Sequence, residues 1–236
     1  MNGRPVIEFR EVRYSYPGGA EALRGISFAV AQGEKVALLG PNGAGKSTLL
    51  LHTDGLLLPS AGEVVVDGIP VERKTLMEVR RRVGLVFQNP DDQLFMPTVE
   101  EDVAFGPLNM GLAPEEVERR IDSAIRAVGA IGLRKRSSMQ LSGGQKRAVA
   151  LATVLAMRPG ILVLDEPTAN LDGRTRAALV DILGRLDCSC IIATHDIDMA
   201  RRLCARALVV EDGRVVADGP CGQVLDRPDV KELLYL

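Results

Sequence analysis

The sequence predicts an α/β fold with an amino-terminal antiparallel β-subdomain, a mostly parallel core sheet and an inserted α-helical subdomain. Apolar and polar residues alternate over much of residues 1–40, as in strands with one exposed face. Near-continuous apolar runs at 161–164 and 189–194 are typical of parallel strands buried on both faces. Between residues 88 and 140, strand signals are largely absent and helical periodicity takes over. We therefore expect one domain over 1–236, with a sheet core from 1–87 and 158–236 and a helical subdomain from 88–157.

The length and charge of the chain exclude some classes of protein. A chain of 236 residues is long enough to bury a large core. Its 29 Lys and Arg nearly balance its 31 Asp and Glu, and this disfavours a nucleic-acid binder, which is more often basic. No apolar run approaches the roughly 18 residues of a membrane-spanning helix, and residues 1–10 lack an apolar signal region. We expect a cytosolic chain without a transmembrane segment.

The amino-terminal strands come first in the chain. The alternating residues 6–9 and 26–30 predict antiparallel strands joined by a turn at 17–19. Residues 35–39 predict a short buried strand that runs into a glycine-rich loop, and a helix is expected from Lys46 onward.

Two later hairpins and several helices complete the expected elements. Residues 62–71 and 208–217 each predict a strand pair with a central Asp-Gly turn, at Asp67-Gly68 and Asp212-Gly213. The helix that starts at Pro114 has one apolar face, formed by Val117, Ile121, Ala124, Ile125 and Val128. Further helices are expected over 175–186 and 197–204, between the buried strands.

The glycine-rich loop after residue 39 matches the phosphate-binding pattern G-x-x-x-x-G-K-[ST], with a predicted strand before it and a helix after it. Its glycines let consecutive N–H groups point at phosphate oxygens. Lys46 would reach the β- and γ-phosphates, and the Ser47 hydroxyl would bind Mg²⁺. The alternative, a chance glycine turn, does not account for this context. The expected ATP-binding residues in this loop are Gly40, Pro41, Asn42, Gly43, Ala44, Gly45, Lys46, Ser47 and Thr48.

Two carboxylates, Asp165 and Glu166, end the apolar strand at 161–164. Adjacent residues at a strand end point in different directions, so the two can have different roles. Asp165 can hold Mg²⁺, while Glu166 can orient the attacking water or act as general base. The alternative is a surface acidic pair before a turn at Pro167, which would leave the charged strand end beside a phosphate loop without a reason.

The segment Leu141-Ser142-Gly143-Gly144-Gln145 fits a capping box, in which Ser142 and Gln145 bond each other's backbone at a helix start. Two glycines in the first turn lower helix stability, and they also remove side chains that would block an anion. A nucleotide in the phosphate loop of the same chain does not need this segment. We therefore infer a second phosphate-binding surface that is offered to another molecule.

Two polar residues follow further predicted strands. His195 comes after the strand at 189–194 and could bond the γ-phosphate or the water. Gln88 comes after the apolar residues 83–87 and could contact the metal and couple it to the helical subdomain. Taken alone, each has a simpler interpretation: a structural histidine and a solvated turn glutamine.

Together these motifs resemble the ATP-binding-cassette (ABC) ATPases of the P-loop NTPase class, over nearly all of the 236 residues. The resemblance implies a Walker A loop at 40–47, a signature at 141–145, a Walker B strand at 161–165 and a D-loop at 169–172. It implies that Tyr16 stacks on adenine, with Tyr14 as the alternative. The implied catalytic residues are Glu166, His195 and Gln88. The implied ligands of Mg²⁺ are Ser47, Gln88 and Asp165, and the implied contacts with the ATP of a partner subunit are Ser142, Gly143, Gly144, Gln145 and Asp172.

Such cassettes work as dimers that hold two ATP molecules between them, and in transporters their closure drives a membrane partner. Residues 86–95 and 97–107 further resemble the energy-coupling-factor importers, especially the cobalt and nickel branch. The implied partners are a second ATPase subunit, a transmembrane coupling protein and a substrate-binding membrane subunit, at the cytoplasmic face of the cell membrane. Leu94, Phe95 and Met96 would line the groove for the coupling protein, or else pack back into the helical subdomain.

Other functions of the chain stay open. A vitamin importer would use a similar cassette, and a soluble ABC ATPase acting on nucleic acid or ribosomes is the alternative of a different class. Such soluble proteins usually carry two cassettes or a long insertion, and this chain has one Walker A loop. A nucleotide-gated clamp without turnover is disfavoured by the presence of both Glu166 and His195.

The chain departs from the family pattern in a few places. Ala148 stands near the position where many relatives have an arginine, with Arg147 one place earlier, and Asn170 and Gly173 differ from the commoner D-loop residues. We expect no carboxyl-terminal dimer-holding extension after Leu236. The four cysteines are expected to be reduced and structural, because the spacing of Cys188 and Cys190 does not fit a zinc knuckle.

Overall fold

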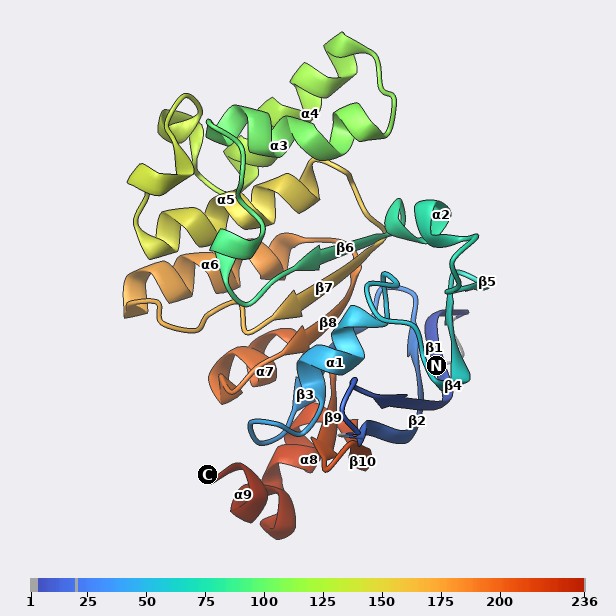
Figure 1. Cartoon of the computed structure of the whole chain (residues 1–236). Coiled ribbons are helices and arrows are strands. Elements are labelled where there is room, and N and C mark those ends of the chain that lie inside the picture. Colours follow the sequence, from blue (N-terminus) through green and yellow to red (C-terminus); the bar gives the residue numbers. More distant parts are fainter. Residues whose placement is uncertain (1–3, 20, 236) are drawn as a thin grey trace.

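Two β-sheets and a layer of helices make up the computed structural model, which describes residues 4–19 and 21–235 (Figure 1). Residues 1–3 and Leu236 lie outside the described residues. The structure therefore does not address the expectation about the end of the chain at Leu236, nor, at its first three residues, the expectation about the amino-terminal stretch 1–10.

The smaller sheet is the predicted antiparallel subdomain, with strand order β2-β1-β4-β5. All neighbouring strands in it run antiparallel. The turn between β4 and β5 has Asp67 and Gly68 at φ angles of 50° and 80°, the left-handed geometry that such a turn requires. Its strands are β1 (Pro5–Ser15), β2 (Glu21–Ala31), β4 (Ala61–Val66) and β5 (Ile69–Pro70).

The larger sheet is the predicted core sheet, with strand order β10-β9-β3-β8-β7-β6. Neighbouring strands from β9 to β6 are parallel, and only β10 at the edge is antiparallel to its neighbour. The loops that follow β3, β6, β7 and β8 therefore leave the sheet from the same edge. The strands are β3 (Lys35–Leu39), β6 (Val83–Val86), β7 (Ile161–Asp165), β8 (Ser189–Ala193), β9 (Arg206–Glu211) and β10 (Arg214–Pro220).

Helices cover both faces of the core sheet, and α3, α4 and α5 form the layer at the top of Figure 1. These three helices pack on one another and confirm the predicted helical subdomain. The α-helices are α1 (Lys46–Leu51), α2 (Leu76–Arg80), α3 (Val99–Asn109), α4 (Pro114–Ala127), α5 (Gly143–Leu155), α6 (Gly173–Arg185), α7 (Ile197–Leu203), α8 (Cys221–Asp226) and α9 (Pro228–Leu234). Short 3₁₀ turns lie at Pro90–Asp92, Ile131–Leu133 and Ser138–Gln140.

The core sheet separates two apolar clusters. Ala37 and Leu39 of β3 belong to the cluster that includes the helical subdomain. Val36 and Leu38 belong to the cluster that includes the small sheet and α1. Burial on both faces explains why the strands of this sheet are near-continuously apolar in the sequence.

The loop after β6 is held by a carboxylate of the following helix, α3. The Asp102 carboxylate on α3 accepts the backbone N–H groups of Phe95 and Met96, each at 3.0 Å. Leu94 is only 6% exposed and packs into the cluster of the helical subdomain, so of its two expected placements the structure shows the second and not the docking groove. Phe95 is 63% exposed and packs edge-on against Phe105, with ring centroids 5.0 Å apart.

All four cysteines are free, and Cys190, Cys204 and Cys221 are buried. In the part of the chain that the structure describes, no three or more His, Cys, Asp or Glu residues gather as a metal site would require. Over the same residues, no helix combines the length and the apolar character needed to cross a bilayer.

Candidate active site

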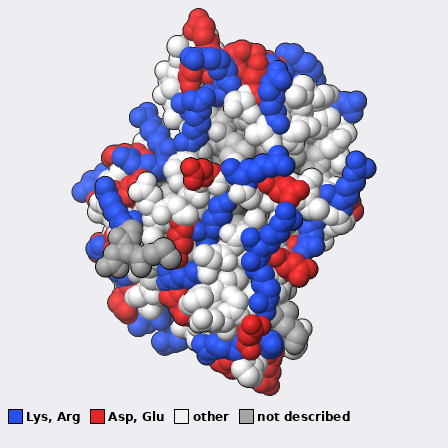
Figure 2. All heavy atoms as spheres, turned by 180° about the vertical axis from the view of Figure 1, so that it is seen from behind, with Lys and Arg blue, Asp and Glu red and all other residues white. Residues whose placement is uncertain are grey.

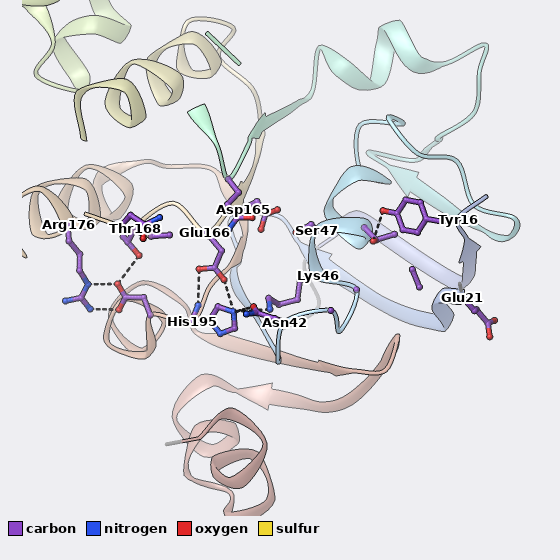
Figure 3. A pocket seen from close by; sticks show the side chains of 18 residues that line it. Tyr16, Glu21, Asn42, Lys46, Ser47, Asp165, Glu166, Thr168, Arg176 and His195 are labelled. Carbon is purple, nitrogen blue, oxygen red and sulfur yellow. Dashed lines mark hydrogen bonds and ion pairs between the residues drawn. The ribbon is translucent and has the colours of Figure 1, made fainter. Parts of the chain in front are cut away.

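The carboxyl-terminal edge of the core sheet and the loop after β3 enclose a cleft of about 830 Å³, here called the Lys46 cleft (Figure 3). Its volume falls within the range of small-molecule sites. Gly40, Pro41 and Ala44 belong to the same loop without lining the cleft. The predicted site residues that line it are Tyr16, Asn42, Gly43, Gly45, Lys46, Ser47, Thr48, Gln88, Asp165, Glu166 and His195.

The loop after β3 is fixed by close backbone packing. Gly40 has a φ angle of 147°, and a Cβ atom there would lie 2.1 Å from the carbonyl oxygen of Val210. Gly45 has a φ angle of 104°, and its Cβ would lie 2.7 Å from the carbonyl oxygen of Ala22. A residue with a side chain cannot occupy either position without moving β9 or β2, so these two glycines fix the path of the loop.

Lys46 is buried at the start of α1, and its ammonium group bonds the loop itself. Nζ donates to the carbonyl oxygens of Gly40 at 2.7 Å and Pro41 at 3.1 Å. Burial lowers the pKa of Lys46, and the nearby Glu166 and Asp165 carboxylates oppose that shift. Its positive charge is therefore poorly solvated and close to the position where a phosphate would enter.

The two carboxylates at the end of β7 are both buried, and burial raises the pKa of each. The Ser47 hydroxyl lies beside Asp165 and partly opposes the shift of its pKa. Glu166 Oε2 accepts the backbone N–H of His195 at 3.2 Å. Glu166 Oε1 is buried and accepts no hydrogen bond from any described residue. A buried oxygen without a donor is costly, so Glu166 has an open place for a donor such as water.

His195 faces the same loop from the end of β8. Its Nε2 lies 3.1 Å from Asn42 Oδ1, 3.3 Å from Lys46 Nζ and 3.3 Å from Glu166 Oε1. Burial and the Lys46 charge lower the pKa of His195, so the ring is neutral near neutral pH. The side chain is still 48% exposed, which leaves one edge of the ring accessible from the cleft.

Of the two candidate tyrosines, only Tyr16 lines the Lys46 cleft. Its hydroxyl lies 3.0 Å from Thr48 Oγ1. Tyr14 packs edge-on against Tyr16 and against the buried His52, each at a centroid distance of 5.0 Å. Tyr14 therefore supports Tyr16 from behind.

The donors around Asp165 fit a magnesium ion. The Ser47 hydroxyl, the Gln88 amide and the Asp165 carboxylate all present oxygen atoms to the Lys46 cleft, and oxygen is the ligand type that Mg²⁺ prefers. Burial raises the pKa of Asp165, and the Ser47 hydroxyl and the Lys46 charge oppose this shift only in part, so a cation beside the carboxylate would favour its ionised form.

Ser142, Gly143, Gly144, Gln145 and Asp172 lie apart from these residues. They line a separate cleft of about 740 Å³, here called the Ser142 cleft. The predicted capping box is present at the start of α5: the Ser142 hydroxyl accepts the Gln145 N–H at 3.3 Å, and the Gln145 side chain accepts the Ser142 N–H at 3.0 Å.

The two glycines of this segment have different roles. A Cβ on Gly143 would meet no atom within 4 Å, so this position is open to an approaching molecule. A Cβ on Gly144 would lie 2.6 Å from Thr175 Cγ2, so this position is needed for the packing of α5 against α6. Asp172 caps α6 and accepts the Thr175 hydroxyl at 2.7 Å. The space at Gly143 and the contact of Gly144 with Thr175 thus distinguish the two positions, and anion access at both stays a prediction.

Sequence reasoning did not assign two arginines beside the Lys46 cleft. Arg176 pairs with Asp196, the residue after His195, and Thr168 donates to the same carboxylate at 3.0 Å. Arg147 on α5 reaches the backbone at Glu166. Neither has a local sequence signal beyond a charged residue on a helix, because its partners come from segments distant in the chain.

Comparison with known proteins agrees with this geometry. The family described as ABC transporter matches residues 23–169. A protein of Methanocaldococcus jannaschii named energy-coupling factor transporter ATP-binding protein EcfA is 50% identical over 91% of this chain and 78% of its own length.

Two solved structures have the same fold. CbiO1 from Clostridium perfringens, described as part of the ABC transporter complex CbiONQ, is 38% identical, with a TM-score of 0.83 over 98% of this chain and 99% of that one. A dimeric ATP-binding cassette in a post-hydrolysis state bound to ADP and Pi is 30% identical, with a TM-score of 0.83 over 91% of this chain and 98% of that one.

Proposed function

The chain belongs to the ABC transporter family, and from that premise we propose that it is the ATPase subunit of an energy-coupling-factor importer of cobalt or nickel ions. The observation that carries the proposal is the pair of clefts. In this proposal the groups lining the Lys46 cleft hydrolyse a nucleotide, and the groups lining the Ser142 cleft bind the phosphates of another subunit's nucleotide.

In the proposed reaction, ATP and water give ADP and phosphate in the Lys46 cleft. Lys46 and the loop N–H groups bind the phosphates, and Tyr16 stacks on adenine. Glu166 orients the attacking water through Oε1 and takes its proton, while His195 bonds the γ-phosphate or that water. Ser47, Gln88 and Asp165 would hold Mg²⁺, which when bound neutralises charge on the phosphate oxygens.

The active unit in this proposal is a cassette dimer. Ser142, Gly143, Gly144 and Gln145 contact ATP held by the partner subunit, with Asp172 in the same cleft. The solved post-hydrolysis cassette that resembles this chain is itself dimeric, and this supports the arrangement. We keep the proposed boundaries of 88–157 for the helical subdomain, which contains the Ser142 segment.

The partner in the membrane is proposed to contact the loop at Phe95. Phe95 and Phe105 are exposed aromatic residues side by side. Asp102 lies on α3, the helix that carries Phe105, and accepts the backbone N–H of Phe95. Phe95→Asp should reduce co-purification of the membrane subunits about tenfold or more while ATPase activity of the chain remains. Leu94→Asp is unsuitable because Leu94 is core, and unchanged co-purification of Phe95→Asp would contradict this contact.

The transported substrate is tested by uptake. The chain is co-expressed with the membrane subunits that co-purify with it, and vesicles are assayed with Co²⁺, Ni²⁺ and biotin. ATP-dependent uptake of Co²⁺ or Ni²⁺ supports the proposal, provided that it is lost in Glu166→Gln. Uptake of biotin alone would make the chain part of a vitamin importer, and no ATP-dependent uptake would contradict an importer for these substrates.

The surface does not favour the alternative of a nucleic-acid partner. On the face seen in Figure 2, basic side chains are interspersed with acidic ones and do not form one continuous basic area. The net charge of −2 is consistent with this view. Electrostatic binding of a polyanion needs clustered Lys and Arg, which this face lacks.

A further inference from the structure

Arg147 lies on α5, two residues beyond Gln145, and is only 7% exposed. Its guanidinium donates from Nη1 to the carbonyl oxygen of Glu166 at 2.7 Å and from Nη2 to the carbonyl oxygen of Ala169 at 3.2 Å. Both acceptors are backbone atoms of the segment that follows β7. A buried arginine thus connects the helix of the Ser142 cleft to the chain at Glu166.

The backbone that Arg147 holds is strained. Glu166 has a φ angle of 46°, in the left-handed region that residues other than glycine rarely adopt, whereas Asn170 at 60° is of a type that tolerates it. A residue such as Glu166 in this region costs about 1–3 kcal/mol and persists only where its surroundings hold it. The contacts on the Glu166 backbone are its N–H to the carbonyl of Ala193 at 2.9 Å, the Ala169 N–H to its carbonyl at 3.1 Å, and Arg147.

Of those contacts, Arg147 alone comes from the helical subdomain. The buried charge of Arg147 also lacks a bonded counter-ion among the described residues. Its two acceptors are neutral carbonyls, and the Glu166 carboxylate is only nearby. Burial lowers the pKa of Arg147, which shows that its charged form is disfavoured there. Burying a charge without a bonded counter-ion is expensive. An apolar side chain would avoid this cost, but it would leave both carbonyls without the donors that Arg147 supplies.

We propose that Arg147 is a positioning residue that holds Glu166 in its left-handed conformation and transmits the state of the Ser142 cleft to it. The proposal rests on the proposed function, because it needs Glu166 to act on a nucleotide. Occupation of the Ser142 cleft fixes the start of α5, α5 fixes Arg147, and Arg147 fixes the Glu166 carbonyl and the D-loop at Ala169. A subunit whose Ser142 cleft binds its partner's nucleotide thereby positions its own Glu166 for hydrolysis.

The chain offers a matched control in Arg120, which lies on α4 and is 14% exposed in its side chain. Its Nη1 donates to two backbone carbonyls, Met157 at 3.1 Å and Ala156 at 3.4 Å. Those carbonyls lie at the far end of α5 and belong to neither cleft. Arg120→Met therefore removes the same kind of backbone contact, together with an ion pair to Glu116 at 2.8 Å, without touching Glu166.

The test compares Arg147→Met with Arg120→Met in the purified chain and in its complex with the membrane subunits. Arg147→Met should lower kcat about 10- to 100-fold, because displacement of a reacting group by about 1 Å has effects of this size. The Kd for ATP should stay within about twofold of wild type. Arg120→Met should keep its kcat, even if its Tm falls as far as that of Arg147→Met.

A second comparison separates positioning from general damage. In the Glu166→Gln background, adding Arg147→Met should cause little further loss of single-turnover rate, because residues that act as a unit are not additive. Arg147→Lys should recover part of kcat, since it keeps one donor. It also serves as the test variant if Arg147→Met does not fold.

Three results would overturn the proposal. The first is wild-type kcat in Arg147→Met or, where that variant does not fold, in Arg147→Lys. The second is an equal fall of kcat in Arg120→Met, and the third is a loss of single-turnover rate by Arg147→Met that adds fully to the loss by Glu166→Gln. Failure of the proposed function gives a different result, since the wild-type chain with its membrane subunits would then not hydrolyse ATP. A wild type that hydrolyses ATP beside an equally active Arg147 variant contradicts only the role of Arg147.

Discussion

The Lys46 cleft contains buried charges of both signs, whereas the Ser142 cleft is lined by apolar side chains together with hydroxyl, amide and backbone groups. Lys46, Asp165 and Glu166 all have a pKa displaced by burial in the first cleft. Among the described residues that line the second, Asp172 is the charged one, and its carboxylate already caps α6. Chemistry therefore belongs to the first cleft, and recognition to the second.

The difference also explains why one chain is incomplete. Polar groups without charge bind phosphate through well-placed N–H donors. They therefore need a phosphate that another site, here the Lys46 cleft of a partner subunit, already holds in position. Lys46 does not line the Ser142 cleft of its own chain, and the two clefts share only Asn170 among their described lining residues. Each of the predictions below changes one cleft and leaves the other intact.

The largest effect is expected for Lys46→Ala. Removing the ammonium group takes away charge-assisted hydrogen bonds of about 1.5–3 kcal/mol each, so ATP affinity should fall about 100-fold or more. Equilibrium binding of a fluorescent ATP analogue measures this loss. Equal affinity in wild type and Lys46→Ala would remove the phosphate-loop assignment and with it the contrast between the clefts.

An intermediate effect is expected for Gly143→Glu. The position is open, so the chain should fold normally, but the new carboxylate would face the phosphates of the partner's nucleotide. Turnover should fall about tenfold or more while ATP binding by the same chain is unchanged. Steady-state kinetics beside equilibrium binding would check this, and a loss of binding equal to the loss of turnover would contradict a separate second cleft.

Gly144→Ala is the control for that variant, since its methyl group would collide with Thr175. Overpacking of this kind costs about 1–3 kcal/mol of folding stability, so thermal unfolding should shift for Gly144→Ala and not for Gly143→Glu. The neighbouring glycines would thus separate a defect of recognition from a defect of folding.

The smallest effect is a shift in pH dependence. A general base must be ionised, and burial raises the pKa of Glu166 above its ordinary 4.5. The rate should therefore fall as pH decreases through this raised pKa, by about tenfold for each pH unit below it. The groups that face Glu166 are Lys46, Asp165, Arg147 and His195. A kcat profile at saturating ATP measures the shift, and a rate that stays constant down to pH 4.5 would exclude Glu166 as the base.

Local patterns were enough to predict most of the fold and much of the candidate site. The Asp-Gly turns at 67–68 and 212–213 and the phosphate loop after β3 depend on neighbours in the sequence, and the structure has them where the sequence places them. The capping box at Ser142 is likewise a four-residue pattern. Such features need only the backbone geometry of their own segment.

The features that the sequence could not predict depend on contacts between segments that are distant in the chain. A side chain at Gly144 would collide with Thr175 of α6, and no pattern around residue 144 predicts that α6 lies there. Leu94 stands among loop residues but reaches the core of the helical subdomain. Arg147 depends on two carbonyls about twenty positions later in the chain, at Glu166 and Ala169. Each depends on the path of a distant segment, which periodicity does not encode.

The division of the proposed site residues between two clefts has a genetic consequence. In the proposed dimer, each composite site takes Lys46 from one copy and Ser142 from the other. A cell expressing one allele with Lys46→Ala and another with Gly143→Glu would assemble mixed dimers in which one site collects both defects and the other none. Two recessive losses in the same gene would then partly complement each other, as lesions in different genes normally do.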